Sequence, residues 1–171
     1  MSAAVSRKVV GMKELTHFTP DGATHMVDVG DKPVTDRLAR AETTVLMQPE
    51  TLRIIRQRGI EKGDVLEVAR LAGIMATKRT DELIPLCHSL GLDSAGISYD
   101  FPTESAVRIV STVKVKGRTG VEMEALTAVS VAALTIYDMC KAIDREMTIS
   151  NTRLLEKSGG RSGHFKRTED S

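Results

Sequence analysis

The alternation of apolar and polar residues over 106–116 constrains the fold more than any other feature of this sequence. One face would carry Val107, Ile109, Ser111, Val113 and Val115, and the other face is rich in Arg, Thr and Lys. A period of two predicts a strand with one buried face. Residues 92–100 alternate more weakly, and Pro102 lies between the two segments. We therefore predict that they form an antiparallel pair.

The apolar stretch 120–144 predicts the main helix of the molecule. Its most apolar part, 125–136, is interrupted by three hydroxyl residues. It is also shorter than the roughly 20 residues needed to cross a bilayer. We therefore expect a buried helix and no membrane partner.

Further helices and strands are predicted on either side of these segments. Pro49 suits the first turn of a helix that ends near residue 58, and Asp64 can cap a helix that ends near residue 78. Strands are expected at about 37–47 and 147–155. This order of elements predicts an α+β fold, with an antiparallel sheet covered by helices on one face.

Neither internal repeats nor a second domain can be recognised along the chain. Residues 1–14 are expected to be a flexible N-terminal arm and residues 15–156 a single catalytic domain. Residues 157–171 are rich in glycine, serine and charge, so we expect a mobile loop and tail there.

Composition and charge exclude several classes of protein. The formal charge of +1 gives no general attraction for polyanions, so any phosphate must be bound by a local cluster of cations. With three Phe, two Tyr and no Trp, the chain lacks the stacking platforms of single-strand nucleic-acid readers. Cys87 and Cys140 are interpreted as reduced, and no secretion signal is recognisable. We expect a cytoplasmic protein without a nucleic-acid partner.

Two short segments could carry chemistry near the middle of the chain. Leu86-Cys87-His88 follows a proline on irregular backbone, where functional residues are frequent. A histidine satisfied by local hydrogen bonds is the alternative. Glu122-Met123-Glu124 begins the long helix, where acidic residues also simply favour the helix dipole. If both carboxylates touch one ligand, we expect backbone there that is not yet regular helix.

Cationic candidates lie at three other places. Asp138 and Lys141 share a helix face. They form either a surface ion pair or, in a cleft, a pair in which the carboxylate keeps the ammonium protonated. Lys62 precedes a helix N-terminus that can attract anions, and a solvated loop lysine is the alternative. Lys157 opens a Gly-rich basic segment that either closes over phosphates or forms a basic tail.

Helix geometry limits how these groups can combine. Glu124 and Asp138 are separated by fourteen residues, which is about 21 Å along an unbroken helix. The two groups cannot reach one small reacting centre from a single chain. If both are functional, the site is assembled from two subunits.

Taken together, these segments resemble the cyclic pyranopterin monophosphate synthase family, the molybdenum cofactor biosynthesis protein C family. The resemblance covers about residues 15–165. Its most specific stretches are 120–133 and 137–142, and 25–29, 62–64, 78–80, 83–88 and 157–160 also match. Ser89 replaces the usual proline, which suggests a less restrained loop, and Arg161 replaces the usual lysine.

This resemblance implies a lyase of molybdenum cofactor (molybdopterin) biosynthesis. It would convert a cyclised dihydro-GTP to cyclic pyranopterin monophosphate and diphosphate. The family also implies a ferredoxin-like fold and a homohexamer, built as a trimer of dimers with sites at subunit interfaces. No cofactor and no protein-bound metal are expected, although Mg²⁺ could accompany the nucleotide triphosphate substrate.

Roles for individual residues follow from the same resemblance. Asp138, Lys62 and Lys141 take catalytic positions. Substrate-binding positions are taken by Leu86, Cys87, His88, Glu122, Met123, Glu124 and Lys157. A nucleotide-binding relative without catalysis and a scaffold for other cofactor enzymes are the rival interpretations.

Overall fold

The structure, a computed structural model, describes residues 16–57 and 64–168. The predicted N-terminal arm and Lys62 lie outside the described residues. The elements follow the order β1 (Thr35–Leu46), α1 (Pro49–Arg56), α2 (Val65–Thr77), α3 (Thr80–Leu83), β2 (Ser94–Thr103), β3 (Ala106–Gly117), α4 (Glu122–Cys140), β4 (Thr148–Ser158) and β5 (Phe165–Lys166).

The strands form one antiparallel sheet in the order β2-β3-β1-β4-β5. The predicted pairing of the segments 92–100 and 106–116 is confirmed by β2 and β3, with Tyr99 opposite Ile109. β1 lies between β3 and β4, so strands far apart in sequence meet at the centre of the sheet. Without β5, this order is that of a ferredoxin-like βαββαβ unit.

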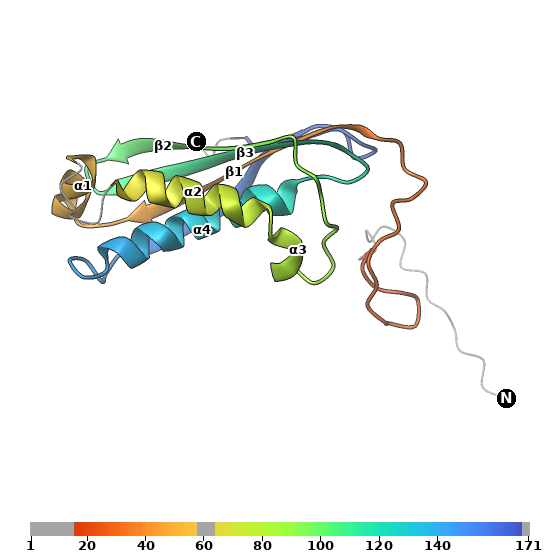
Figure 1. The fold of residues 1–171 in the computed structure, drawn as a ribbon, viewed down its shortest axis with the longest axis horizontal. Coiled ribbons are helices and arrows are strands. Elements are labelled where there is room, and N and C mark those ends of the chain that lie inside the picture. The colour runs from red at the N-terminus through yellow and green to blue at the C-terminus, as the bar shows by residue number, and fades with distance from the viewer. Residues whose placement is uncertain (1–15, 58–63, 169–171) are drawn as a thin grey trace.

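The helices cover one face of the sheet, as predicted. Figure 1 shows α2 and α4 side by side beneath the sheet, with α1 at one end. α4 packs against β1, β3 and β4, and α2 packs against α4 and β2. The α+β class expected from the order of elements is therefore confirmed.

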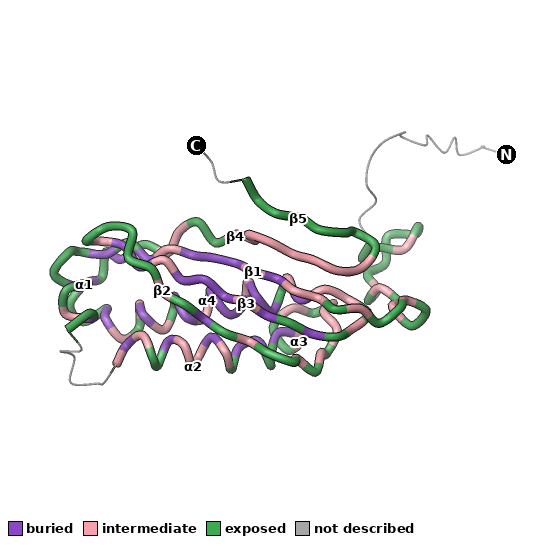
Figure 2. Tube along the Cα trace, turned by 90° about the horizontal axis from the view of Figure 1, so that it is seen from above, coloured by how far each residue is buried: buried purple, intermediate pink, exposed green. Residues whose placement is uncertain are grey.

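The core lies between the sheet and α4. All five residues assigned to the inner face of the 106–116 strand are buried, and Figure 2 shows the same burial along β1 and α4. Small residues allow α2 to approach α4 closely. A Cβ added at Gly73 would lie 2.7 Å from the Ala128 carbonyl oxygen, a contact that real Cβ atoms do not make.

α4 is long and apolar enough to cross a membrane by length and composition alone. Half of its apolar window is buried inside the fold, and the helix contacts three strands. It is therefore a core helix typical of a soluble protein, as expected from the sequence.

Two differences from the predicted elements lie near the C-terminus. The last long strand continues to Ser158 rather than ending near residue 155, and Phe165–Lys166 form β5 against it. The mobility expected of residues 157–171 from their glycine, serine and charge stays a prediction. The additional pairing forms because strands pair through backbone groups, so a polar segment can add to a sheet edge.

Candidate active site

The segment Leu86-Cys87-His88 lies in an irregular loop between α3 and β2. The Cys87 amide donates to the Ile84 carbonyl at 3.1 Å, which makes a turn after Pro85. His88 Nε2 lies 2.8 Å from the Val27 carbonyl oxygen. A carbonyl can only accept, so Nε2 carries the proton and Nδ1 of the neutral ring remains an acceptor.

Ser89 fixes the same loop from its other side. Its hydroxyl donates to the Asp81 carboxylate on α3. The sequence suggested a less restrained loop because Ser89 replaces a proline. In the structure the serine supplies its own restraint through a side-chain hydrogen bond.

Glu122 and Glu124 lie on the first turn of α4. Glu122 is half-buried, whereas only 3% of Glu124 is exposed. Both line the same cavity although the helix begins at Glu122, so irregular backbone is not needed. Burial raises the pKa of Glu124, and the nearby Glu122 and Asp81 charges add to this effect. Burial likewise raises the pKa of the Cys87 thiol, with smaller effects from Glu124 and Asp81.

These two segments meet in a cavity of about 300 Å³, which we call the inner lobe. Its walls include every residue of both segments. The inner lobe is lined by Thr16, His17, Val27, Val29, Lys32, Leu86, Cys87, His88, Leu90, Thr119, Gly120, Glu122, Met123 and Glu124. It therefore combines apolar walls with an imidazole and two carboxylates.

A second cavity of about 520 Å³, the outer lobe, adjoins the first. Lys32, Thr119, Gly120 and Glu122 line both lobes. Five cationic residues line the outer lobe, namely Lys32, Arg37, Arg118, Lys157 and Arg161. Glu122 is the one acidic residue of that lining, so the lobe is suited to a multiply charged anion.

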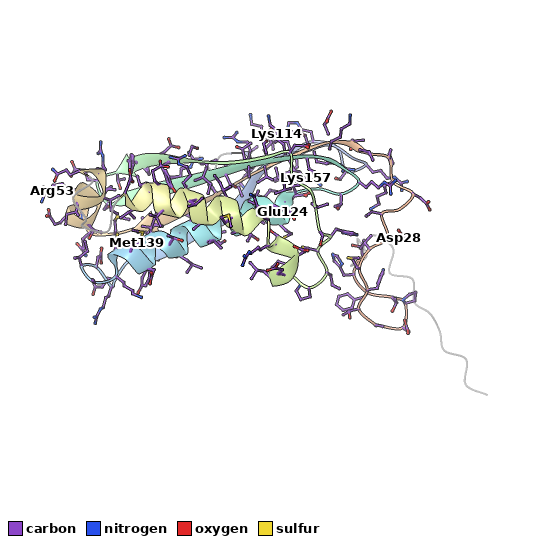
Figure 3. All side chains as sticks on the ribbon, viewed as in Figure 1. Asp28, Arg53, Lys114, Glu124, Met139 and Lys157 are labelled. Carbon is purple, nitrogen blue, oxygen red and sulfur yellow. The ribbon has the colours of Figure 1, made fainter. Side chains whose placement is uncertain are left out.

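Lys157 lies where the two lobes join. Its Nζ is 3.0 Å from Glu122 Oε1 and donates to Ser162 Oγ at 2.6 Å. In Figure 3, Lys157 and Glu124 lie toward the same end of α4, and Met139 marks the opposite end. The structure thus brings together all seven residues predicted to bind substrate.

Close packing of the Gly-rich turn depends on two glycines. Gly159 and Gly160 have φ of 95° and 72°, a region that L side chains rarely adopt. A Cβ on Gly160 would overlap the Arg37 guanidinium. Arg37 itself donates to the carbonyls of Gly117 and Arg118, at 3.3 and 3.2 Å. The turn can therefore lie directly against a fixed guanidinium.

Asp138 and Lys141 lie at the far end of α4. Lys141 Nζ is 2.6 Å from Asp138 Oδ1, and both side chains are more than half exposed. This hydrogen bond and the carboxylate charge raise the pKa of Lys141, so it stays protonated. α4 is continuous from Glu122 to Cys140, so the predicted separation of about 21 Å applies. Within one chain, this pair does not join the two lobes.

The remaining catalytic candidate, Lys62, lies outside the described residues. The helix that follows it is capped as predicted. Asp64 Oδ1 accepts hydrogen bonds from the amides of Leu66 and Glu67 at 3.1 and 3.3 Å. The element that would position Lys62 therefore begins where the sequence indicated.

Sequence reasoning missed three cations of the outer lobe: Lys32, Arg37 and Arg118. No local motif singles them out, and only the pairing of β1 with β3 brings Thr35 opposite Gly117. That register places Arg37 beside the turn that carries Arg118. The sequence signal was weak, since Arg118 merely precedes the Thr119-Gly120 turn before the acidic segment.

Across residues 16–57 and 64–168, no three His, Cys, Asp or Glu side chains are grouped so that they could hold a metal ion. The cationic outer lobe would repel a free metal ion.

The fold and the site define a small α+β protein with a two-lobed, cation-rich cleft suited to an anionic ligand. Comparison with known proteins then places it within a family. Residues 26–160 match the model of the MoaC family, so the chain belongs to the MoaC family.

Named relatives agree with this assignment. A cyclic pyranopterin monophosphate synthase of Magnetococcus marinus is 63% identical over 158 residues, covering 91% of this chain and 96% of the relative. One from Chloroflexus aurantiacus is 59% identical, covering 90% and 95%. Cyclic pyranopterin monophosphate synthase 1 of Mycobacterium bovis is 58% identical, covering 90% and 91%.

Proposed function

We propose that this chain is a cyclic pyranopterin monophosphate synthase, a lyase in an early step of molybdenum cofactor biosynthesis. Its substrate would be (8S)-3′,8-cyclo-7,8-dihydroguanosine 5′-triphosphate, and its products cyclic pyranopterin monophosphate and diphosphate. The observation that carries the proposal is the two-lobed cleft. One lobe is cationic, and the adjoining lobe holds groups that accept and donate protons.

The outer lobe fits the triphosphate. Arg37, Arg118, Lys157 and Arg161 supply local positive charge that a chain of net charge +1 does not supply globally. When a substrate hydroxyl attacks the α-phosphorus, the bond to the bridging oxygen breaks and diphosphate leaves. Fixed cations stabilise the negative charge that develops on the leaving group.

The inner lobe fits the purine-derived ring. Leu86, Cys87 and Met123 offer apolar contact, while the Glu122 and Glu124 carboxylates can accept ring N–H groups. The pKa of Glu124 is raised by burial, which brings a carboxyl group toward the range useful for proton transfer near neutral pH. Ring opening and rebuilding require such positioned acids and bases.

Asp138, Lys141 and Lys62 complete the proposed site from a neighbouring subunit. The length of α4 separates Asp138 from Glu124, so one chain cannot provide both groups to one ligand. Exposed apolar side chains on the helical layer also favour assembly. Val68, Leu71 and Met75 are 43%, 63% and 45% exposed along one face of α2. We propose a homohexamer, a trimer of dimers, in the cytoplasm.

Turnover of the cyclised dihydro-GTP tests this function directly. The full chain should release diphosphate and a pterin product. Lys141→Ala should lose turnover while it still assembles, because a proton-donating or phosphate-binding ammonium is removed. Lys114→Ala, on an exposed part of β3, is the matched control. A folded oligomer that binds GTP but leaves the cyclised substrate unchanged would reject the synthase in favour of a non-catalytic relative.

A further inference from the structure

The turn between β4 and β5 forms one wall of the outer lobe. Few backbone contacts hold this turn in place. β5 has two residues, which pair as Glu156↔Lys166 and Lys157↔Phe165. The turn itself contains three glycines with positive φ and a Gly163–Gly160 hydrogen bond of 3.2 Å. So short a ladder is marginal, and side-chain contacts therefore decide how firmly the turn is held.

One such contact lies on the cavity side. Lys157 Nζ reaches both Glu122 on α4 and Ser162 within the turn. Lys157 belongs to the proposed substrate site, so a bound phosphate would compete for its ammonium. This contact cannot hold the turn and bind substrate independently.

A further side-chain contact, from Arg167 Nε to the Leu154 carbonyl oxygen at 2.9 Å, lies just after β5. A third contact lies on the opposite face of the sheet. His164 Nε2 is 2.9 Å from Glu156 Oε1, and Arg40 Nη1 is 3.5 Å from Glu156 Oε2. Arg40 pairs with Glu156 across β1 and β4, so the chain of contacts reaches the middle strand of the sheet. Because side chains alternate along a strand, Glu156 and its neighbour Lys157 point to opposite faces. The contact of His164 with Glu156 thus restrains the turn without occupying the cavity.

We propose that His164 is a positioning residue that latches the Gly-rich turn over the outer lobe through Glu156. This inference rests on the proposed function, since it assigns to that turn the binding of the substrate's phosphates. When His164 is protonated, its hydrogen bond to Glu156 becomes an ion pair, and the turn that carries Arg161 and Ser162 is held more tightly.

The charges around Glu156 determine the sign of the pH dependence. Within the part of the chain that the structure describes, the cationic or titratable groups that face this carboxylate are His164, Arg40 from β1, and Lys166 directly opposite on β5. Hydrogen bonds from His164 first, and then from Arg40, lower the pKa of Glu156, so it is ionised at neutral pH. Among these three residue types, only histidine gains a proton in the range between pH 8 and pH 6. The latch therefore tightens as the pH falls from 8 to 6.

Ligand affinity and amide exchange test the latch without turnover, and KM tests it with turnover. Inorganic triphosphate affinity and amide exchange over residues 159–164 should be compared at pH 6 and pH 8 for wild type and His164→Gln. At pH 6 the variant should bind about two- to fivefold more weakly and exchange faster by a similar factor, as for a half-exposed ion pair. At pH 8 the two proteins should agree. KM for the cyclised substrate should follow the same pattern, with kcat little changed.

Two further variants make the assignment specific. Glu156→Gln should reproduce the effect, and the double variant should add nothing, because both changes remove one contact. Thr168→Ala, on the same segment, should behave as wild type. If His164→Gln retains the wild-type pH dependence of binding and exchange, the latch is rejected. If exchange depends on His164 but wild type leaves the cyclised substrate unchanged, the latch stands and the proposed function falls.

Discussion

At the scale of single residues, environment sets what the carboxylates and lysines of the cleft can do. Glu122 and Glu124 lie two residues apart, yet one is half-buried against a lysine and the other is enclosed. Lys141 is held protonated by Asp138, whereas Lys157 contacts an acid and a hydroxyl at the same time. The same residue types thus serve different roles, because neighbouring charge and burial differ.

Lys157→Ala should weaken substrate use far more than it weakens the fold. The substitution removes a cation from the junction of the two lobes, so kcat/KM should fall by about ten- to a hundredfold. The thermal midpoint should change little, since the ion pair with Glu122 is partly exposed. Steady-state kinetics and thermal unfolding measure the two effects. The control Arg53→Ala, which breaks an exposed ion pair on α1, should alter neither kcat/KM nor the thermal midpoint. A wild-type rate for Lys157→Ala would remove this lysine from the site.

Glu124→Gln should stabilise the protein at high pH while abolishing turnover. Burial raises the pKa of Glu124 in the folded state above its unfolded value. The stability that the neutral Glu124 side chain contributes is therefore fully present below about pH 4.3. It is lost as the pH rises through the pKa of Glu124 in the folded state. Glutamine does not titrate, so the variant should match wild type near pH 4 and melt at a higher temperature near pH 8. Lower stability at pH 8, with exposed Glu104→Gln unchanged as the control, would contradict this account.

At the scale of elements, pairing between distant strands creates interactions that no local pattern contains. Glu42 on β1 lies on the sheet face opposite the helices, yet its side chain is only 5% exposed. Arg108 from β3 approaches it at 2.5 Å and Arg153 from β4 at 2.7 Å. Three strands are thus joined across the open face of the sheet by one carboxylate.

Glu42→Gln should destabilise the sheet at neutral pH. Burial alone would raise the pKa of Glu42, but hydrogen bonds from Arg153 and Arg108 outweigh it and the pKa is lowered. This stabilisation is present above the unfolded pKa and is lost as the pH falls through the folded pKa. At pH 7 the free energy of unfolding should fall by about 1–3 kcal/mol, less than for a fully buried pair because both arginines are partly exposed. Denaturant unfolding at pH 7 and pH 3 should show that the difference in the free energy of unfolding between wild type and Glu42→Gln becomes smaller at low pH. The exposed Glu50→Gln serves as the control.

At the scale of the whole molecule, the length of α4 separates two sets of groups that the proposed chemistry needs together. The cleft lies at its N-terminal end and the Asp138–Lys141 pair at its C-terminal end. Shortening this nineteen-residue core helix would remove contacts that it makes with the sheet. Assembly of subunits offers a way to join both ends at one ligand.

Mixed oligomers of two impaired variants should regain activity. Asp138→Asn and Lys157→Ala each damage a different part of the proposed site. If each site draws one part from each of two subunits, random pairing restores about a quarter of the sites. Co-expression of the two variants followed by turnover assays measures this fraction. Each variant alone should keep only its own reduced rate, and no gain on co-expression would mean that one chain supplies the complete site.

Local pattern in the sequence determined much of the fold and the identity of one part of the site. Alternation over 106–116 specified the buried face of β3, and Asp64 specified the start of α2, because burial and capping follow from neighbouring residues. The segments 86–88 and 122–124 were likewise recognisable in sequence before their cavity was seen.

Only the tertiary structure decided the rest. Lys32, Arg37 and Arg118 form one cationic lobe because β1 pairs with β3 in a particular register, and Glu42 meets two arginines for the same reason. β5 forms because backbone groups pair whatever their side chains are. Contacts between residues distant in sequence depend on how whole elements are arranged, and a single sequence shows no period or spacing that encodes them.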